Sequence, residues 1–306
     1  MTVRVDEVRA AAERIAGRVR RTPVIEVASG LTFKLEHLQH TGSFKPRGAF
    51  NRLLSAKESG ELTGQGIVAA SGGNAGLAAA YAARGLGVHA RIFVPANAPA
   101  PKVAKLHKLE AEVVQIGTEY AEAYLAAVEA RDESGALLLH AYDQPEVVAG
   151  QGTVGLELLD QVDGFDTVLV AVGGGGLLAG IATAIGDQAR VVGVEPELSQ
   201  ALHRALEAGE PVDGPVAGIA ADSLGARRVG DLAYAAVQDN GVRSLLVSDD
   251  EIVAARNELW HAYHLGVEHG AAAAYAALTS GVYQPAAGER VVVVICGANT
   301  DPTTLI

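Results

Sequence analysis

The chain has 306 residues and a formal net charge of −12 at pH 7, with 36 acidic against 24 basic residues. Hydrophobic residues make up 49% and charged residues 20% of the sequence, which excludes disordered and fibrous proteins. The acidic excess repels phosphate backbones and anionic lipid surfaces, so we expect neither nucleic acid nor a membrane as a partner.

A single cysteine, Cys296, excludes an intrachain disulfide framework and any cluster of thiolates around a metal. The N-terminal segment carries charges throughout and is typical of an amphipathic surface helix, not of a signal peptide. Two uncharged stretches, 167–186 and 270–288, contain glycine runs, proline or polar side chains that do not suit a membrane. We therefore expect a cytoplasmic protein.

Strand and helix signals alternate from one end of the chain to the other. Strands are predicted at 32–35, 67–70, 88–94, 112–116, 137–139, 168–172, 191–195, 245–247 and 291–295. Ala-rich segments of helical length lie between them, at 76–84, 101–109, 120–133, 156–161, 177–185 and 250–265. Because several strands are apolar on both faces, this order predicts an α/β fold with mostly parallel sheets flanked by helices.

Two breaks in the pattern, before Gly64 and near Gly135, are the candidate domain boundaries. They predict a small domain of residues 61–136 inserted into a large domain made of 1–60 and 137–306. Ligands usually bind between domains, so we expect the active site in the cleft between the two.

Glycine-containing loops follow two predicted strands, at the edge of the sheet where ligands bind in this fold class. The SGGNAG loop (71–76) leaves N–H groups free at a helix start, which suits a carboxylate or a phosphate. The GGGGL loop (173–177) exposes successive N–H donors to one anion, and phosphate is the ligand we expect there. Its spacing differs from nucleotide-binding fingerprints, which disfavours a nucleoside triphosphate or NAD. Taken alone, it is equally a tight turn between a strand and a helix.

A third motif, SFKPRGA (43–49), places Lys45 at a helix start, with Pro46 at a helix-initiating position. The positive end of the helix and partial burial against Phe44 lower the cost of losing the amine proton, as a Schiff-base lysine requires. A solvated surface lysine is the alternative interpretation.

These motifs occur together with QGT (151–153), GVEP (193–196) and CGAN (296–299). Their order is that of fold-type II pyridoxal-phosphate enzymes, and over nearly its whole length the chain resembles a serine/threonine dehydratase. The resemblance implies two open, mostly parallel twisted sheets of the tryptophan synthase β-like kind, pyridoxal 5'-phosphate as the cofactor, and a homodimer.

The resemblance also implies roles for individual residues. Lys45 stands where the family links its cofactor covalently, and Phe44 where a side chain lies against the cofactor ring. Asn74 resembles the donor to the phenolic oxygen, and Cys296 stands where the family places a Ser or Cys facing the pyridine nitrogen. The residues that resemble the phosphate cradle are Gly173, Gly174, Gly175, Gly176 and Leu177. Those that resemble the substrate-carboxylate site are Ser71, Gly72, Asn74 and Ala75.

The implied reaction is β-elimination from L-serine or L-threonine, which gives pyruvate or 2-oxobutyrate plus ammonia. The freed Lys45 amine is the expected base for the Cα proton. A thiol does not hold the pyridine nitrogen protonated, so Cys296 favours prompt elimination over the long-lived carbanion of a racemase. A small buried apolar filler is the other interpretation of Cys296.

Departures from the family pattern bear on the substrate. Serine racemases of this fold place a serine where this chain has Gly72, which disfavours racemisation. Ala75 resembles the serine dehydratase branch, since many threonine dehydratases have His there. Hydroxyaspartate dehydratase, amino-acid racemase, β-replacement synthase and a non-enzymatic module for a phosphorylated ligand stay as alternatives.

No metal site is predicted. Glu195 ends a strand where relatives hold a structural cation, but Ala201 replaces a second acidic ligand, which leaves a monovalent cation or an ordinary capping or surface role. The group His261, His264, Glu268 and His269 has metal-ligand spacing on a helix but lacks a further element, so we expect surface side chains. Asp222 matches a family segment near the substrate side chain, or it is a loop cap.

Overall fold

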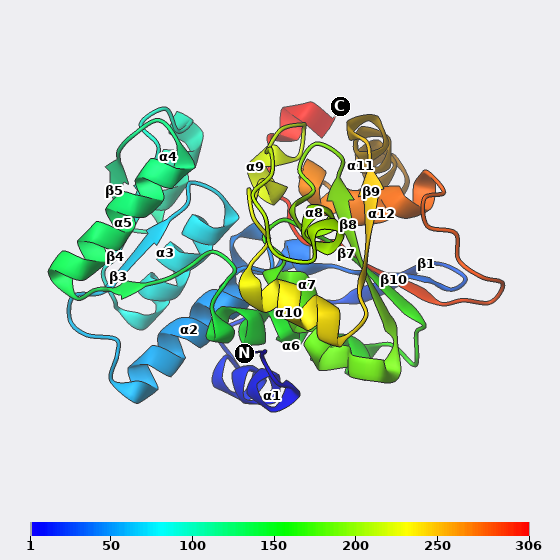
Figure 1. The fold of residues 1–306 in the computed structure, drawn as a ribbon, viewed down its shortest axis with the longest axis horizontal. Helices are drawn as coiled ribbons and strands as arrows, with labels where there is room; N and C mark the ends of the chain where they lie inside the picture. Colours follow the sequence, from blue (N-terminus) through cyan, green and yellow to red (C-terminus); the bar gives the residue numbers. More distant parts are fainter. Residues whose placement is uncertain (1, 306) are drawn as a thin grey trace.

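The computed structural model describes residues 2–305, which form two sheets with helices packed on them (Figure 1). The larger sheet has six strands in the order β1-β2-β10-β7-β8-β9, and every neighbouring pair except β1 and β2 is parallel. Its strands are β1 (Val24–Ala28), β2 (Leu31–Lys34), β7 (Thr167–Ala171), β8 (Arg190–Pro196), β9 (Arg243–Val247) and β10 (Val291–Val294). The strand β7 is buried along its whole length, as expected for a central parallel strand.

The smaller sheet has four parallel strands in the order β5-β4-β3-β6. They are β3 (Ile67–Ala70), β4 (Ala90–Val94), β5 (Glu112–Gln115) and β6 (Leu137–Leu138). Side chains of β3 alternate between two cores, because Ile67 and Ala69 belong to one cluster and Val68 and Ala70 to another. Both faces of this sheet are therefore covered.

Helices separate into groups that follow the two sheets. Those of the smaller sheet are α3 (Asn74–Leu86), α4 (Ala100–Lys108) and α5 (Tyr120–Ser134), which form the lobe on the left of Figure 1. Helix α2 (Pro46–Ser59) packs on α3 and also on α6 (Pro145–Gln161), so it joins the two lobes. The others are α1 (Val5–Arg14), α7 (Gly176–Ile185), α8 (Ala201–Ala208), α9 (Ala221–Leu224), α10 (Asp231–Asp239), α11 (Asp249–Tyr263) and α12 (His269–Thr279). Short 3-10 turns are η1 (Glu36–Leu38), η2 (His40–Gly42), η3 (Gly186–Gln188) and η4 (Pro302–Leu305).

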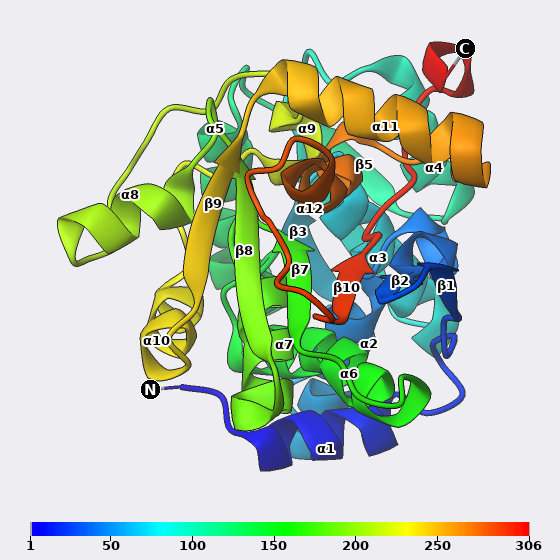
Figure 2. The same ribbon diagram turned by 90° about the vertical axis from the view of Figure 1, so that its right-hand side faces the viewer.

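Around the larger sheet, α1, α6, α7 and α10 form one group of helices. Helices α11 and α12 form another, and α12 packs on β7 and β8 (Figure 2). Among residues 2–305 no helix is both long and apolar enough to span a membrane. The uncharged stretch at 167–186 is the strand β7, the glycine loop and α7, as predicted.

The predicted α/β class with mostly parallel sheets is confirmed. Helices α8, α9, α10 and α12 were not among the predicted ones, and β1 and α6 also differ from the prediction. The sequence signal missed β1, because this half-exposed edge strand lacks a clear apolar alternation. Helix α6 begins at Pro145, well before the predicted start at 156, because its glycines weakened the helical signal. These glycines allow close packing: a Cβ on Gly150 would lie 2.6 Å from the Arg47 carbonyl oxygen, and one on Gly152 2.7 Å from that of Gly180.

The smaller sheet is built entirely from strands between residues 67 and 138. Its strand β6 pairs with β3, so the sheet continues two residues beyond the boundary predicted at 136. In the sequence, a short apolar strand gives no sign of which sheet it joins. The division into two domains stays a proposal.

Candidate active site

Lys45 is the residue that precedes α2, with Pro46 at the first helical position, as the motif predicted. Its half-buried amine donates a hydrogen bond to the Ala141 carbonyl oxygen, 2.8 Å away, and lies 5.0 Å from the centre of the Phe44 ring. Burial lowers the pKa of the Lys45 amine to about 8, although Cys296 and Glu268 act in the opposite direction. The hydrogen bond to Ala141 thus fixes the direction of the amine, and the amine loses its proton more easily than a solvated lysine.

The start of α2 is fixed by an ion pair beneath Lys45. The Arg47 guanidinium donates to both carboxylate oxygens of Glu36, at 2.8 and 2.7 Å, and also to Glu157 at 2.8 Å. Lys34 shares Glu157, and the side chains of Arg47, Glu36 and Lys34 are fully buried. Since the ion pair ties α2 to η1 and α6, Lys45 projects from a rigid support.

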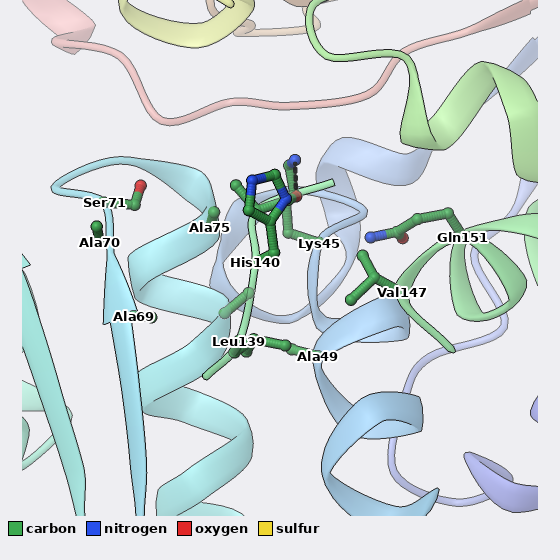
Figure 3. Close-up of a pocket in the computed structure, with 12 residues that line it drawn as sticks. Lys45, Ala49, Ala69, Ala70, Ser71, Ala75, Leu139, His140, Val147 and Gln151 are labelled. Atoms are coloured by element: carbon green, nitrogen blue, oxygen red, sulfur yellow. Dashed lines mark hydrogen bonds between the residues drawn. The ribbon is translucent and has the colours of Figure 1, made fainter. Parts of the chain in front are cut away.

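A pocket opens beside the Lys45 side chain, between α2, α3 and the segment after β6 (Figure 3). Its lining residues are Lys45, Ala49, Ala69, Ala70, Ser71, Ala75, Ala78, Leu139, His140, Ala141, Val147 and Gln151. The buried floor is mostly alanine, while Ser71 and His140 stand at the more exposed side. The His140 Nδ1 accepts the backbone N–H of Asp143 at 2.8 Å, and burial lowers the pKa of His140. Lys45 is therefore the cationic group of this pocket.

The SGGNAG loop connects β3 to α3 at one side of the pocket. The Ser71 hydroxyl accepts the Gly73 N–H at 3.2 Å, and the helix begins at Asn74, two residues before the predicted start. The backbone N–H groups of Gly72, Asn74 and Ala75 have no protein acceptor within residues 2–305. A Cβ on Gly76 would lie 1.8 Å from the Ser71 carbonyl oxygen, so only glycine fits there. The loop is built to receive an anion such as a carboxylate.

The glycine loop connects β7 to α7, and the Tyr142 ring lies flat against it. A Cβ on Gly174 would lie 2.3 Å from the Tyr142 Cγ, and Gly175 has a φ of +86° that favours glycine. The backbone N–H groups from Gly173 to Leu177 have no protein acceptor among the described residues. Free donors at the start of a helix match the phosphate cradle predicted from the sequence.

Cys296 follows β10 and is buried, and burial raises the pKa of its thiol, so it is neutral at pH 7. The Phe44 N–H donates to the Cys296 carbonyl oxygen at 3.2 Å, which places Cys296 beside the lysine motif. The loop that carries Cys296 thus lies against the lysine motif.

Glu268 and Asn299 join these loops. The sequence analysis gave neither residue a role in binding cofactor or substrate. The Glu268 carboxylate accepts hydrogen bonds from the Asn74 side-chain amide at 2.7 Å and from the Asn299 backbone N–H at 3.1 Å. Glu268 is buried, which corrects its expected place on the surface; it precedes α12 and faces the domain interior. In the sequence, its one distinguishing feature is its position directly before the alanine-rich segment that forms α12.

The other residues of the suspected metal group do not join Glu268. His261 is on α11, His264 follows that helix and His269 begins α12. Among residues 2–305 there is no group of three or more His, Cys, Asp or Glu side chains able to hold a metal. Asp222, on α9, is exposed and lies 3.7 Å from the Lys102 amine of α4, so it bridges the two lobes.

Glu195 is fully buried, which corrects the surface interpretation and agrees with the capping one. Its carboxylate accepts the backbone N–H groups of Leu202 and His203 at the start of α8, at 2.7 and 2.8 Å, and the Ser244 hydroxyl at 2.6 Å. These three hydrogen bonds, two of them from the first turn of α8, are the arrangement of a helix cap.

The residues present fit pyridoxal phosphate. A half-buried lysine of lowered pKa, an aromatic ring beside it, a neutral thiol and a loop of free N–H donors are the set of groups that this cofactor requires. Phosphate would take the donors of the glycine loop, and the lysine would supply the covalent link.

Comparisons with known proteins agree with this reading. Residues 15–297 match the family model described as pyridoxal-phosphate dependent enzyme. An L-threonine ammonia-lyase of Geobacter sulfurreducens is 38% identical over 303 residues, which are 96% of this chain and 75% of that protein. A phenylserine dehydratase of Ralstonia pickettii is 37% identical over 95% of this chain and 91% of its own. The structure of maize serine racemase superimposes with a TM-score of 0.93 at 32% identity, covering 100% of this chain and 96% of that one.

Proposed function

The chain belongs to the family of pyridoxal-phosphate dependent enzymes, and from this premise we propose that it eliminates water from L-threonine or L-serine. The products are ammonia and 2-oxobutyrate or pyruvate. The observation that carries the proposal is the Lys45 amine, which has a lowered pKa and stands between an anion-binding loop and a neutral thiol. Relatives named as a threonine ammonia-lyase and a phenylserine dehydratase support a hydroxy amino acid as substrate.

The substrate carboxylate is assigned to the SGGNAG loop. The N–H groups of Gly72, Asn74 and Ala75, together with the Ser71 hydroxyl, offer donors without competing protein acceptors. A carboxylate held there lies on the side of the pocket lined by Ser71 and Lys45. This orients Cα toward the amine and leaves the β-substituent to the alanine-lined part of the pocket.

The Lys45 amine is assigned as the base that removes the Cα proton. With a pKa of about 8, about a tenth of it is neutral at pH 7, far more than for a solvated lysine. The Ala141 carbonyl oxygen, 2.8 Å from Nζ, accepts a hydrogen bond and keeps the nitrogen aimed when it carries the extra proton. When bound, pyridoxal phosphate supplies the electron sink for the pair released at Cα.

Cys296 bears on the choice between reactions. Its thiol is neutral because burial raises its pKa, so it does not place a charge beside the expected position of the pyridine nitrogen. A weaker electron sink favours prompt elimination at Cβ over a long-lived carbanion. Amino-acid racemisation is the second candidate, supported by the fold shared with maize serine racemase. Gly72 lacks the side chain that the racemases use, which favours the lyase.

The test is release of 2-oxo acid from L-threonine, L-serine and D-serine by the purified protein with pyridoxal phosphate. Lys45→Ala is expected to lose the visible absorbance of the bound cofactor and at least 10²-fold in rate. Lys57→Ala, on the same helix but exposed, is the control and is expected to keep both. A coloured protein that releases no oxo acid from any of these would move the reaction to racemisation, to replacement at Cβ or to another substrate such as hydroxyaspartate. A protein that binds no cofactor would overturn the proposal and favour a phospholigand module.

Three finer expectations from the sequence stay predictions: a homodimer, a cytoplasmic location and a monovalent cation.

A further inference from the structure

Glu268, Asn74 and Asn299 form a hydrogen-bonded cluster that joins three loops of the site. The Glu268 Oε1 accepts from the Asn74 Nδ2 at 2.7 Å, and the Asn74 Oδ1 accepts from the Asn299 Nδ2 at 2.7 Å. The Asn299 Nδ2 also donates to the Thr41 carbonyl oxygen at 2.7 Å, just before the lysine motif. The cluster thus connects the SGGNAG loop of the smaller lobe to the loops before Lys45 and after Cys296.

The cluster leaves the Asn74 amide one orientation. An ionised carboxylate only accepts hydrogen bonds, so the atom of Asn74 that faces Glu268 must be Nδ2. The Asn299 Nδ2 faces the other end of the same amide and requires an acceptor there, which is Oδ1. The two hydrogen bonds therefore require the same orientation of the Asn74 amide. One hydrogen of the Asn74 Nδ2 remains for a further acceptor.

The Glu268 carboxylate is held as tightly as the amide it orients. Its Oε2 accepts the Asn299 backbone N–H at 3.1 Å, and its side chain is buried. A Cβ on Gly297 would lie 2.2 Å from the Glu268 Oε1, which explains a glycine directly after Cys296. With both oxygens accepting and the neighbouring backbone in contact, the carboxylate has no freedom to turn away from Asn74.

Charged and titratable groups of several elements act on Glu268. Burial raises the pKa of its carboxyl to about 7, Asp222 adds to the rise, and Lys102 and the Asn74 hydrogen bond oppose it. The charge of Glu268 in turn raises the pKa of both Lys45 and Cys296. Ionisation of Glu268 is therefore complete only above neutral pH, and a protonated oxygen would turn one acceptor of the cluster into a donor.

We propose that Glu268 is the positioning residue that fixes the Asn74 amide, so that the free Nδ2 hydrogen points to the phenolic oxygen of the cofactor. This inference rests on the proposed function, because it takes pyridoxal phosphate as the group that Asn74 meets. Glu268 acts through Asn74, whose amide it holds by the hydrogen bond to Oε1.

The test compares Glu268→Gln with Glu195→Gln. A glutamine has one acceptor oxygen, so at 268 it must turn an N–H toward either Asn74 or the Asn299 backbone. Glu195→Gln is the matched control, because it also leaves one backbone N–H without an acceptor oxygen. Glu195 is buried, its pKa is raised to about 7, and it accepts backbone N–H groups on both oxygens. It contacts no residue of the cluster. The readouts are the Kd of pyridoxal phosphate for the cofactor-free protein and the absorbance maximum of the bound form from pH 6 to 9.

We expect Glu268→Gln to weaken cofactor binding on the order of tenfold, which matches one unsatisfied buried group, and to remove the pH dependence of the absorbance maximum. Glu195→Gln is expected to stay within about twofold of the wild-type Kd. Wild-type affinity and an unchanged spectral pH profile in Glu268→Gln would overturn the inference while leaving the proposed function intact. A wild-type protein that binds no cofactor would overturn both.

A second variant separates positioning from a merely structural role. Asn74→Asp places two carboxylates face to face, and Asn74→Asp/Glu268→Gln reverses the polarity of the pair, because the new amide at 268 donates to the new carboxylate at 74. We expect the double variant to recover the thermal stability lost by Asn74→Asp but not the cofactor spectrum, because aspartate has no N–H for the phenolic oxygen. Recovery of the wild-type spectrum together with stability would overturn the inference.

Discussion

Arg47, two residues after the catalytic lysine candidate, forms a buried ion pair with Glu36 through two hydrogen bonds. The Arg47 Nε lies 2.8 Å from the Glu36 Oε2, and Nη2 lies 2.7 Å from Oε1. Neither side chain reaches solvent, so the pair is protected from screening. Its geometry explains why the arginine of the SFKPRGA motif follows the lysine by two residues: it anchors the helix that begins directly after Lys45.

Glu36→Ala is expected to lower the free energy of unfolding by about 3–5 kcal/mol, because it leaves the guanidinium of Arg47 buried without its main partner. Urea titration of the cofactor-free protein measures the loss. Asp6→Ala, which removes an exposed partner of Arg9, is the control and is expected to change stability by less than about 1 kcal/mol. A loss below about 1 kcal/mol for Glu36→Ala would contradict the anchoring role.

Gly174→Ala is expected to weaken pyridoxal phosphate binding by tenfold or more. A Cβ there would lie 2.3 Å from the Tyr142 ring, so either the ring or the loop with its free N–H groups must move. Gly64→Ala is the control, since that glycine has no positive φ and no atom within 4 Å of the added Cβ. The double variant Gly174→Ala/Tyr142→Ala removes the clash and should regain part of the affinity. An identical Kd for Gly174→Ala and wild type would contradict the assignment of this loop as the phosphate-binding site.

The sequence was informative where chemistry depends on local backbone. Glycine loops after strands and a lysine before a helix are local patterns, so the loops around Lys45, Asn74 and Gly174 could be predicted, as could the parallel sheets. Contacts between segments far apart in the chain could not. The Asn74–Glu268 hydrogen bond joins residues 194 positions apart, and no periodicity indicates that a glutamate near three histidines will be buried against an asparagine.

The same limit applies to the pocket and to Glu195. Nothing local indicates that the Ala141 carbonyl oxygen will accept from the Lys45 amine, because 96 positions separate the two residues. Glu195 was placed at the end of a strand, but its burial depends on α8 and Ser244 folding over it. The sheets were predictable because their strands are apolar; the polar contacts between them follow from the tertiary fold.

Glu195→Gln is expected to reduce the pH dependence of stability. Burial raises the pKa of Glu195 from 4.5 to about 7, so between these values the folded protein binds more protons than the unfolded chain. Stability contributed by the protonated form is therefore full below pH 4.5 and is lost as the pH rises through 7, by about 3 kcal/mol. Unfolding titrations at several pH values between 4.5 and 8 should show a smaller fall for Glu195→Gln, whatever its absolute stability. Equal slopes for the two proteins would show that Glu195 does not titrate in this range.

Covalent attachment of pyridoxal phosphate is expected to follow the titration of Lys45. Burial lowers the pKa of this amine to about 8, so below that pH most of it is protonated and cannot attack the cofactor aldehyde. Stopped-flow absorbance on the cofactor-free protein should show a rate that rises with pH and levels off above pH 8. Lys45→Ala provides the baseline, and a rate that keeps rising steeply beyond pH 9 would contradict the lowered pKa.

Gly72→Ser tests the boundary between elimination and racemisation. A Cβ at Gly72 would meet only Val94, at 3.5 Å, and the backbone there does not have a positive φ, so the fold should accept serine within about 0.5 kcal/mol. The new hydroxyl stands where the sequence resemblance places the proton donor of racemases, and D-serine formation from L-serine is expected to rise above that of wild type. Gly73→Ser is the matched control, because its Cβ also has room, with the nearest atom the Asp222 carbonyl oxygen at 3.7 Å. Chiral chromatography of the amino acid pool, run beside 2-oxo acid release, measures both reactions; equal D-serine from the two variants would show that a hydroxyl at 72 does not reach Cα.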